Sequence, residues 1–290
     1  MEADGLAAAA ERAEKWAGEP FLRPDEEPAE ALAEGRARRR ALDDALEEME
    51  AGRRTPSPSW KIRYSLMLGL ERELTDRPPR LASGTELRRH QIDALAGMLT
   101  ELIARHEEEA ENGNGHANGH AHEEPEDDEE REDEEVEDDE GEPASEEDPG
   151  AVRRFRFRHP TASGKTIAAA GFVEGARTMG VLILTHRRLL VQQFTNDLTT
   201  EGYGDRLRPA IEDGQEPLRG NPITIQTYAW FARHVDSISK SAYQLVICDE
   251  AHTALGEKTS SAIRRFADPI YIGMTATEQL IAKQVSDVFP

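Results

Sequence analysis

The chain has 290 residues, enough for one large domain or two small ones, and a formal net charge of −23. Its single cysteine, Cys248, excludes a disulfide framework and a cysteine-based zinc site. The sequence has no run of about 18 apolar residues and no basic or apolar segment typical of a secretion signal at its start. It therefore predicts a cytoplasmic protein without a membrane span.

The negative charge is concentrated in one stretch. Residues 107–148 hold 23 acidic residues and one basic residue, whereas residues 153–290 hold 17 Lys and Arg against 14 Asp and Glu. The low pI therefore describes one segment of the chain. It does not exclude nucleic-acid binding by the remainder.

The first 80 residues are predicted to form a helical region that is partly disordered. Residues 29–49 have helix-forming composition and indicate one or two exposed, loosely docked helices. Apolar side chains recur every four residues across 60–74, which predicts an amphipathic helix that needs a partner. A further helix is predicted over 85–103, where leucine and isoleucine again form one stripe.

Residues 107–150 have low complexity, with Asn-Gly-His repeats followed by an acidic run. Self-repulsion and the lack of apolar residues predict a disordered acidic insertion. A solubilising insertion is the favoured interpretation, and mimicry of nucleic acid that blocks a basic surface is the alternative. His116, His120 and His122 indicate a solvated tract more than a metal site, because the repeat is flexible and holds no cysteine.

From Val152 onward, apolar segments of strand length alternate with helical segments. The alternation predicts a doubly wound, mostly parallel α/β sheet. This domain is expected to comprise residues 81–106 and 151–290. The expected strands are 154–158, 181–185, 222–226, 244–248 and 270–273, and the expected helices are 165–177, 188–199, 228–236, 259–266 and 279–287.

A phosphate loop is predicted at 159–166, because this segment follows a strand and begins a helix. Backbone N–H groups at such a helix start bind phosphate, Lys165 can reach the β and γ oxygens, and Thr166 can offer its hydroxyl to Mg²⁺. His159 stands where the strict pattern has glycine. The alternative is a plain helix start with an exposed lysine. The expected nucleotide-binding residues are Thr161, Ala162, Ser163, Gly164, Lys165 and Thr166.

An acidic motif, Asp249-Glu250-Ala251-His252, follows the wholly apolar segment 245–248. A buried parallel strand would deliver it to the carboxyl edge of the sheet, where ligands of α/β proteins bind. There Asp249 can hold Mg²⁺, Glu250 can deprotonate the attacking water, and His252 can sense the γ-phosphate. An acidic surface turn is the alternative, but the phosphate loop upstream favours an ATP–Mg²⁺ site with Lys165, Asp249 and Glu250 as catalytic residues. Cys248 is interpreted as a small buried hydrophobe.

Together these motifs resemble the DEAH-type superfamily 2 helicases and translocases. Residues 181–194 resemble motif Ia, 223–228 resemble motif Ib, and 273–277 resemble motif III, which links hydrolysis to movement. Residues 87–95 resemble the segment whose glutamine reads adenine. The resemblance implies a RecA-like P-loop NTPase domain that binds ATP and Mg²⁺.

The same resemblance implies roles for individual residues. Gln91 would hydrogen-bond adenine, and Thr275 and Thr277 would couple hydrolysis to movement. The residues that would contact a nucleic-acid backbone are Thr185, Arg187, Arg188 and Thr227. The wording of motif Ia is closest to the helicase-like subunits of restriction enzymes, including type III subunits, which favours DNA over RNA as the partner.

In this family a second RecA-like domain with arginine fingers normally follows motif III, yet the sequence stops at Pro290. We therefore expect a fragment that binds ATP in a half-site and hydrolyses it poorly, because an arginine finger contributes about 10³–10⁵ in rate.

Three alternatives remain at this stage. The segment 160–166 also resembles the loop of tRNA prenyltransferases, although those enzymes would not supply the acidic motif and motif III in this order. A non-catalytic ATP- or DNA-binding module that acts through a partner is the second alternative. An RNA helicase is the third.

Overall fold

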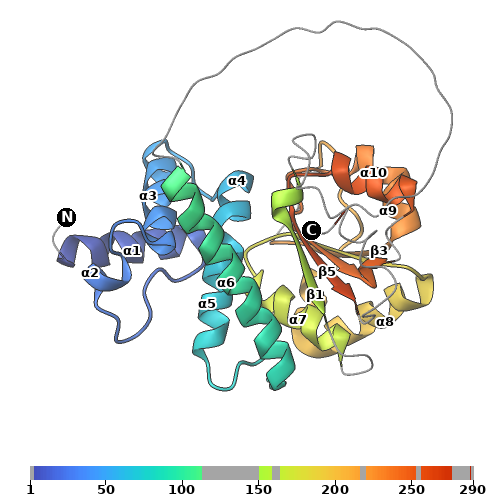
Figure 1. Cartoon of the computed structure of the whole chain (residues 1–290), viewed down its shortest axis with the longest axis horizontal. Coiled ribbons are helices and arrows are strands. Elements are labelled where there is room, and N and C mark those ends of the chain that lie inside the picture. The colour runs from blue at the N-terminus through green and yellow to red at the C-terminus, as the bar shows by residue number, and fades with distance from the viewer. Residues whose placement is uncertain are drawn as a thin grey trace, which may run out of the picture.

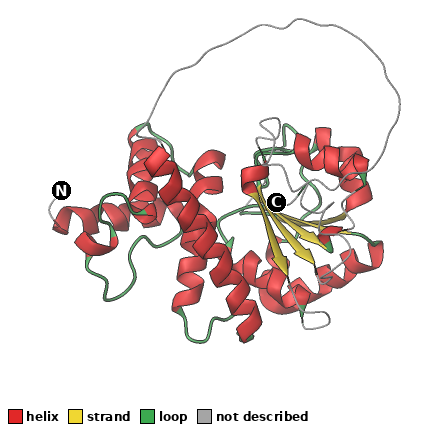
Figure 2. Cartoon of the chain, in the orientation of Figure 1, coloured by secondary structure: helices red, strands yellow, loops and turns green. Residues whose placement is uncertain are grey.

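A computed structural model describes residues 3–112, 150–158, 164–215, 220–252, 256–275 and 288. An all-helical N-terminal part lies beside an α/β part that contains every strand (Figures 1 and 2). The predicted helix 279–287 and residues 113–149 of the acidic insertion lie outside the described residues.

The N-terminal part is built from helices that share a core. The prediction of exposed, loosely docked helices was wrong, because Leu32 and Leu42 are fully buried and Trp60 packs edge-on against Trp16 at 5.3 Å. None of the helices in the described part of the chain is long and apolar enough to cross a lipid bilayer. The elements are α1 (Ala3–Ala17), α2 (Pro28–Ala31), α3 (Ala37–Glu50), α4 (Pro58–Trp60), the π-helix η1 (Lys61–Ser65), α5 (Leu66–Thr75) and α6 (Arg89–Asn112).

Helix α6 differs from its prediction at both ends. It begins at Arg89, because the chain first turns at Ser83, where the backbone N–H donates to the Glu201 carbonyl oxygen at 3.0 Å. It also continues to Asn112, so the first residues of the predicted acidic insertion are helical. Residues 107–112, which were predicted to belong to the insertion, therefore belong to α6.

The α/β part is a five-stranded, all-parallel sheet in the order β1-β5-β4-β2-β3. The predicted fold class is confirmed, and the β1 and β2 bounds match their predictions. The strands are β1 (Arg154–Arg158), β2 (Val181–Thr185), β3 (Ile223–Thr227), β4 (Leu245–Asp249) and β5 (Ile270–Thr275). The helices are η2 (Ala151–Arg153), α7 (Lys165–Gly175), α8 (Arg188–Leu198), the π-helix η3 (Thr199–Tyr203), η4 (Gly204–Arg206), α9 (Tyr228–His234), η5 (Val235–Ser237) and α10 (Glu257–Arg265).

Helices cover both faces of the sheet (Figure 1). Along β2, Val181 and Ile183 point into the core formed with α7, α8 and the N-terminal helices, whereas Leu182 and Leu184 point into the core formed with α9 and α10. Every residue of β2 and β4 is buried, as expected for strands covered on both sides. The carboxyl ends of β1, β4 and β2 therefore meet at one edge.

The N-terminal part packs on α7, the helix that begins at Lys165. Helices α5 and α7 approach so closely that a Cβ added at Gly69 would lie 1.8 Å from the Gly175 carbonyl oxygen. Arg72 of α5 donates to the carboxylates of Glu174 and Glu19 at 3.1 and 2.9 Å. One apolar cluster runs from α1 through α7 to the sheet. The helical part is therefore an integral support of the α/β part.

A buried acid lies in this interface. Glu73 of α5 is 2% exposed, and neither of its carboxyl oxygens has a hydrogen-bond partner among the described residues. Burial, with a smaller contribution from the nearby carboxylate of Glu174, outweighs the opposing charge of Arg72 and raises the pKa of Glu73 to about 9. Glu73 is therefore protonated in the folded protein at neutral pH.

Replacing Glu73 by Gln is expected to stabilise the protein in a pH-dependent manner. The folded-state pKa lies above the usual value of 4.5, so the wild type loses stability as pH rises through that window towards about 9. Urea unfolding should show a gain on the order of 2–4 kcal/mol at pH 8 and much less at pH 5. The exposed Glu47→Gln should show no such trend, and an equal gain at both pH values would contradict the assignment.

Candidate nucleotide site

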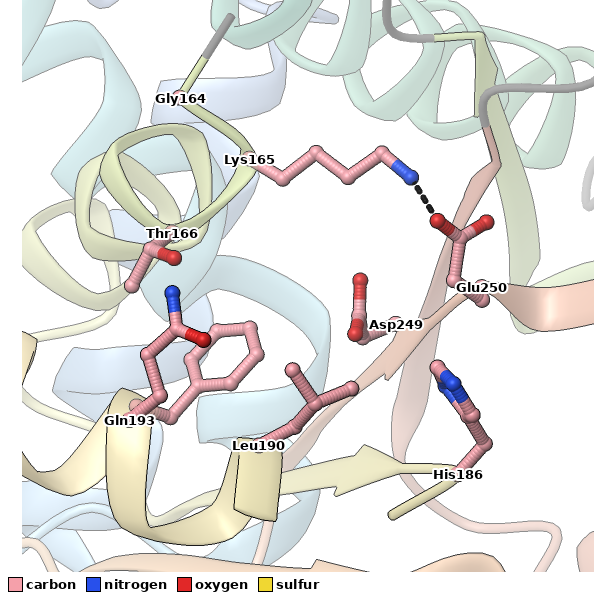
Figure 3. Close-up of a pocket in the computed structure, with 9 residues that line it drawn as sticks. Gly164, Lys165, Thr166, His186, Leu190, Gln193, Asp249 and Glu250 are labelled. Carbon is pink, nitrogen blue, oxygen red and sulfur yellow. Dashed lines mark hydrogen bonds and ion pairs between the residues drawn. The ribbon is translucent and has the colours of Figure 1, made fainter. Parts of the chain in front are cut away.

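A pocket of about 410 Å³ opens at the carboxyl edge of the sheet, between the starts of α7 and α8 (Figure 3). Lys165 and Glu250 are 85 positions apart in the sequence and meet there because each follows a strand of the same parallel sheet. The lining residues are Gly164, Lys165, Thr166, His186, Leu190, Gln193, Phe194, Asp249 and Glu250.

The start of α7 requires a glycine. Gly164 has φ +89°, in the left-handed region, and a Cβ there would lie 3.0 Å from the side-chain nitrogen of Gln91. Gln91 donates to the Gly164 carbonyl oxygen at 3.2 Å and accepts from the Arg88 N–H at 2.8 Å. Gln91 is 2% exposed and does not line the pocket. It buttresses the glycine, and its proposed contact with adenine stays a prediction.

Lys165 extends across the pocket to Glu250 and forms an ion pair with its carboxylate (Figure 3). Both side chains are largely shielded, with exposures of 16% and 23%. Glu250 adopts a positive φ of 49°, which is unusual for a residue with a side chain and turns the chain sharply after β4. An incoming phosphate would compete with Glu250 for the Lys165 ammonium.

Asp249 is the last residue of β4 and is 5% exposed. Burial raises the pKa of its carboxyl, and the neighbouring charge of Glu250 raises it further, while Lys165 and the Thr185 hydroxyl lower it. Thr185 donates to Asp249 at 3.2 Å, and the Tyr228 hydroxyl donates to the Asp249 carbonyl oxygen at 2.8 Å. A cation in the pocket would favour the ionised carboxylate.

Oxygen ligands suited to Mg²⁺ face the pocket from two elements. The Asp249 carboxylate and the Thr166 hydroxyl both line it. Among the described residues, no three His, Cys, Asp or Glu side chains gather as a metal site. Carboxylate and hydroxyl oxygens are ligands that Mg²⁺ takes together with waters and substrate phosphates, and the Mg²⁺ site stays a prediction.

His252 connects the acidic motif to the neighbouring strand. Its Nδ1 shares a hydrogen bond with the Thr275 hydroxyl at the end of β5, at 3.2 Å, and lies 3.5 Å from a Glu250 oxygen. His252 therefore links the end of β5 to Glu250, the residue predicted to activate water. Thr277 lies outside the described residues, as do Thr161, Ala162 and Ser163 of the predicted phosphate loop.

The residues predicted to contact nucleic acid separate into two groups. Arg187 and Arg188 are exposed where α8 begins. Thr185 is fully buried and its hydroxyl donates to Asp249, so its predicted contact with nucleic acid stays a prediction. Thr227 caps α9, with its hydroxyl oxygen accepting from the Trp230 N–H at 3.2 Å.

Sequence reasoning missed the α8 side of the pocket. Leu190, Gln193 and Phe194 follow the i, i+3, i+4 spacing of one helix face, and that periodicity is the signal that could have identified them. Within this segment the sequence predicted roles only for Thr185, Arg187 and Arg188, as contacts of a nucleic-acid backbone. His186, which precedes the helix, was missed for the same reason.

The sequence matches the ResIII family, described as type III restriction enzyme, res subunit, over residues 85–280, about two thirds of the chain. No curated protein matches it. Among solved structures, the UvsW helicase from bacteriophage T4 is 16% identical, with a TM-score of 0.37 and coverage of 50% of this chain and 58% of that one. The Pyrococcus furiosus Hef helicase domain is 21% identical, with a TM-score of 0.37 and coverage of 49% and 34%. A hypothetical ATP-dependent RNA helicase from Sulfolobus tokodaii is 23% identical, with a TM-score of 0.37 and coverage of 47% and 45%.

The chain spans less than two thirds of the length of each of these structures. The matched residues 85–280 include the start of α7, the acidic motif and all five described strands, β1 to β5. The chain therefore belongs to the ResIII family.

Proposed function

We propose that this chain is the ATP-binding motor domain of a DNA-dependent ATPase that couples ATP hydrolysis to movement on DNA. The observation that carries the proposal is the convergence of Lys165, Asp249 and Glu250 in one pocket at the carboxyl edge of a parallel sheet. The family match supports the nucleotide. The choice of DNA over RNA is favoured by the restriction-enzyme family to which the chain belongs.

In the proposed reaction each residue has one task. The N–H groups at the start of α7 and the Lys165 ammonium bind the phosphates, and Asp249 with Thr166 would hold Mg²⁺, which neutralises phosphate charge when bound. Glu250 accepts a proton from the attacking water. His252 connects Glu250 to Thr275 through its hydrogen bond, so that a change in the charge or position of Glu250 would affect Thr275.

Two parts of the proposal lie outside the pocket. Arg187 and Arg188 would bind the phosphates of the nucleic-acid strand, which supplies affinity without base specificity. No arginine is among the described residues that line the pocket. We propose that a second RecA-like domain supplies the arginine fingers, and that turnover without it is slow.

The proposal is tested by measuring ATP hydrolysis alone and with single-stranded DNA, duplex DNA or RNA. DNA-stimulated turnover is expected, and Lys165→Ala should lower it on the order of 100-fold, because the ammonium binds charge that develops on the phosphates. The control is Lys240→Ala, because Lys240 is exposed and does not line the pocket. Nucleotide binding without turnover would favour a non-catalytic module, and stimulation by RNA alone would reassign the substrate.

A further inference from the structure

The first two turns of α8 form one wall of the pocket. Leu190 and Phe194 supply its apolar part, and Phe194 is anchored in the core. Gln193 lies between them on the same helix face and its carboxamide points into the pocket (Figure 3). Gln193 is exposed, so core packing does not account for its orientation.

The neighbouring glutamine has a different environment. Gln192 is exposed, lies outside the pocket lining, and donates to the Asn196 side chain at 3.0 Å. The same outer surface carries Arg188 and Leu189, and Leu189 is 78% exposed. Two consecutive glutamines of one helix thus face the nucleotide pocket and the solvent respectively.

The α8 wall of the pocket is connected to Asp249 through strand β2. Helix α8 follows β2, whose last residue, Thr185, donates to Asp249 at 3.2 Å, and β2 pairs directly with β4. Lys165 and Gln193 line the same pocket, and the Lys165 ammonium reaches Glu250, the residue that follows Asp249. A terminal phosphate held by this ammonium would therefore share one cavity with the Gln193 carboxamide.

We propose that Gln193 is a specificity-determining residue of the nucleotide site, whose carboxamide donates a hydrogen bond to the terminal phosphate and so distinguishes ATP from ADP. This inference rests on the proposed nucleotide site. A carboxamide suits the position because it donates to an anionic oxygen without adding charge beside Lys165. Because Arg187 and Arg188 begin the same helix, the element that senses the terminal phosphate also carries the proposed DNA contacts.

The test measures affinities for Mg²⁺ with AMP-PNP, a non-hydrolysable triphosphate, and for Mg²⁺ with ADP, by calorimetry. Gln193→Ala should weaken AMP-PNP binding by about tenfold or more, the value of a hydrogen bond to a charged group, and leave ADP binding within about twofold. Gln193→Glu should weaken AMP-PNP binding further, because its carboxylate repels phosphate. Gln192→Ala should leave both affinities unchanged.

The outcomes separate this inference from the function it rests on. Equal weakening of both nucleotides in Gln193→Ala, or no weakening of either, would overturn the role of Gln193 while the nucleotide site stands. A wild-type chain that binds neither nucleotide would overturn the proposed function together with this inference. Circular dichroism of both Gln193 variants establishes that a loss of binding is not a loss of fold.

Discussion

Replacing Glu250 by Gln is expected to lower ATP turnover by a factor on the order of 10²–10⁴ while ATP binding persists. The carboxylate is the only proton acceptor proposed for the attacking water, and an amide of nearly the same shape cannot accept that proton. The side chain lines the pocket and lies beside His252, so the substitution preserves its position. Turnover in the presence of DNA is the measurement.

The same substitution should tighten ATP binding. Glu250 holds the Lys165 ammonium in an ion pair that a phosphate must break. Because a partly exposed pair of this kind contributes up to about 1 kcal/mol, its removal should raise ATP affinity by up to about fivefold. Tighter binding together with lost turnover is a result that general damage to the fold would not produce.

The control is Glu257→Gln, which removes an exposed carboxylate at the start of α10. It should change neither turnover nor affinity. If Glu250→Gln kept wild-type turnover, another group would have to accept the proton and the assignment of Glu250 would be lost. If turnover fell but ATP affinity fell as well, the ion pair with Lys165 would not compete with phosphate.

The sequence predicted the elements of the α/β part because their signals are local. The apolar run 245–248 continues into Asp249 at the end of β4, and parallel strands place their carboxyl ends at one edge. Together with the strand that precedes Lys165, those two facts predict that Lys165 lies near Asp249 and Glu250. The positions of strands and helices then followed from where apolar runs and helical spacing alternate.

What the sequence did not predict depends on contacts between distant residues. The contact of Thr185 with Asp249 was not predicted, because it depends on the pairing of β2 with β4. Whether the Gln193 side chain points into the pocket depends on the direction in which α8 leaves β2. Glu73 resembles any charged residue of an amphipathic helix, and only the approach of α7 makes it a buried acid.

The burial of the N-terminal helices was not predicted, for a related reason. Their core positions include many alanines, among them Ala13, Ala41 and Ala45, which are fully buried. Alanine contributes little to an apolar stripe, so the periodicity is weak even where helices pack tightly. The small side chains permit close helix contact, which composition alone presents as an exposed, charged region.

Replacing Gly69 by Ala is expected to lower the free energy of unfolding by on the order of 3 kcal/mol. The added methyl group would lie 1.8 Å from the Gly175 carbonyl oxygen, which belongs to the backbone of α7 and cannot rotate away. Relief requires α5 to move off α7, which also separates Arg72 from Glu174. Urea unfolding followed by circular dichroism measures the loss.

Tryptophan fluorescence shows whether the two parts unfold as one unit. Trp16 and Trp60 report on the N-terminal helices and Trp230 reports on α9, so Trp230→Phe leaves a signal from the helical part alone. Because a single apolar cluster joins the N-terminal helices to the sheet, this signal and circular dichroism should give coincident transitions, and Gly69→Ala should shift both equally. Gly256→Ala is the control, since a methyl group there meets nothing within 4 Å and its φ is −62°. A fluorescence transition that shifts while the sheet unfolds as before would show that the helical part is a separate domain, and α7 would then keep its place without support from α5.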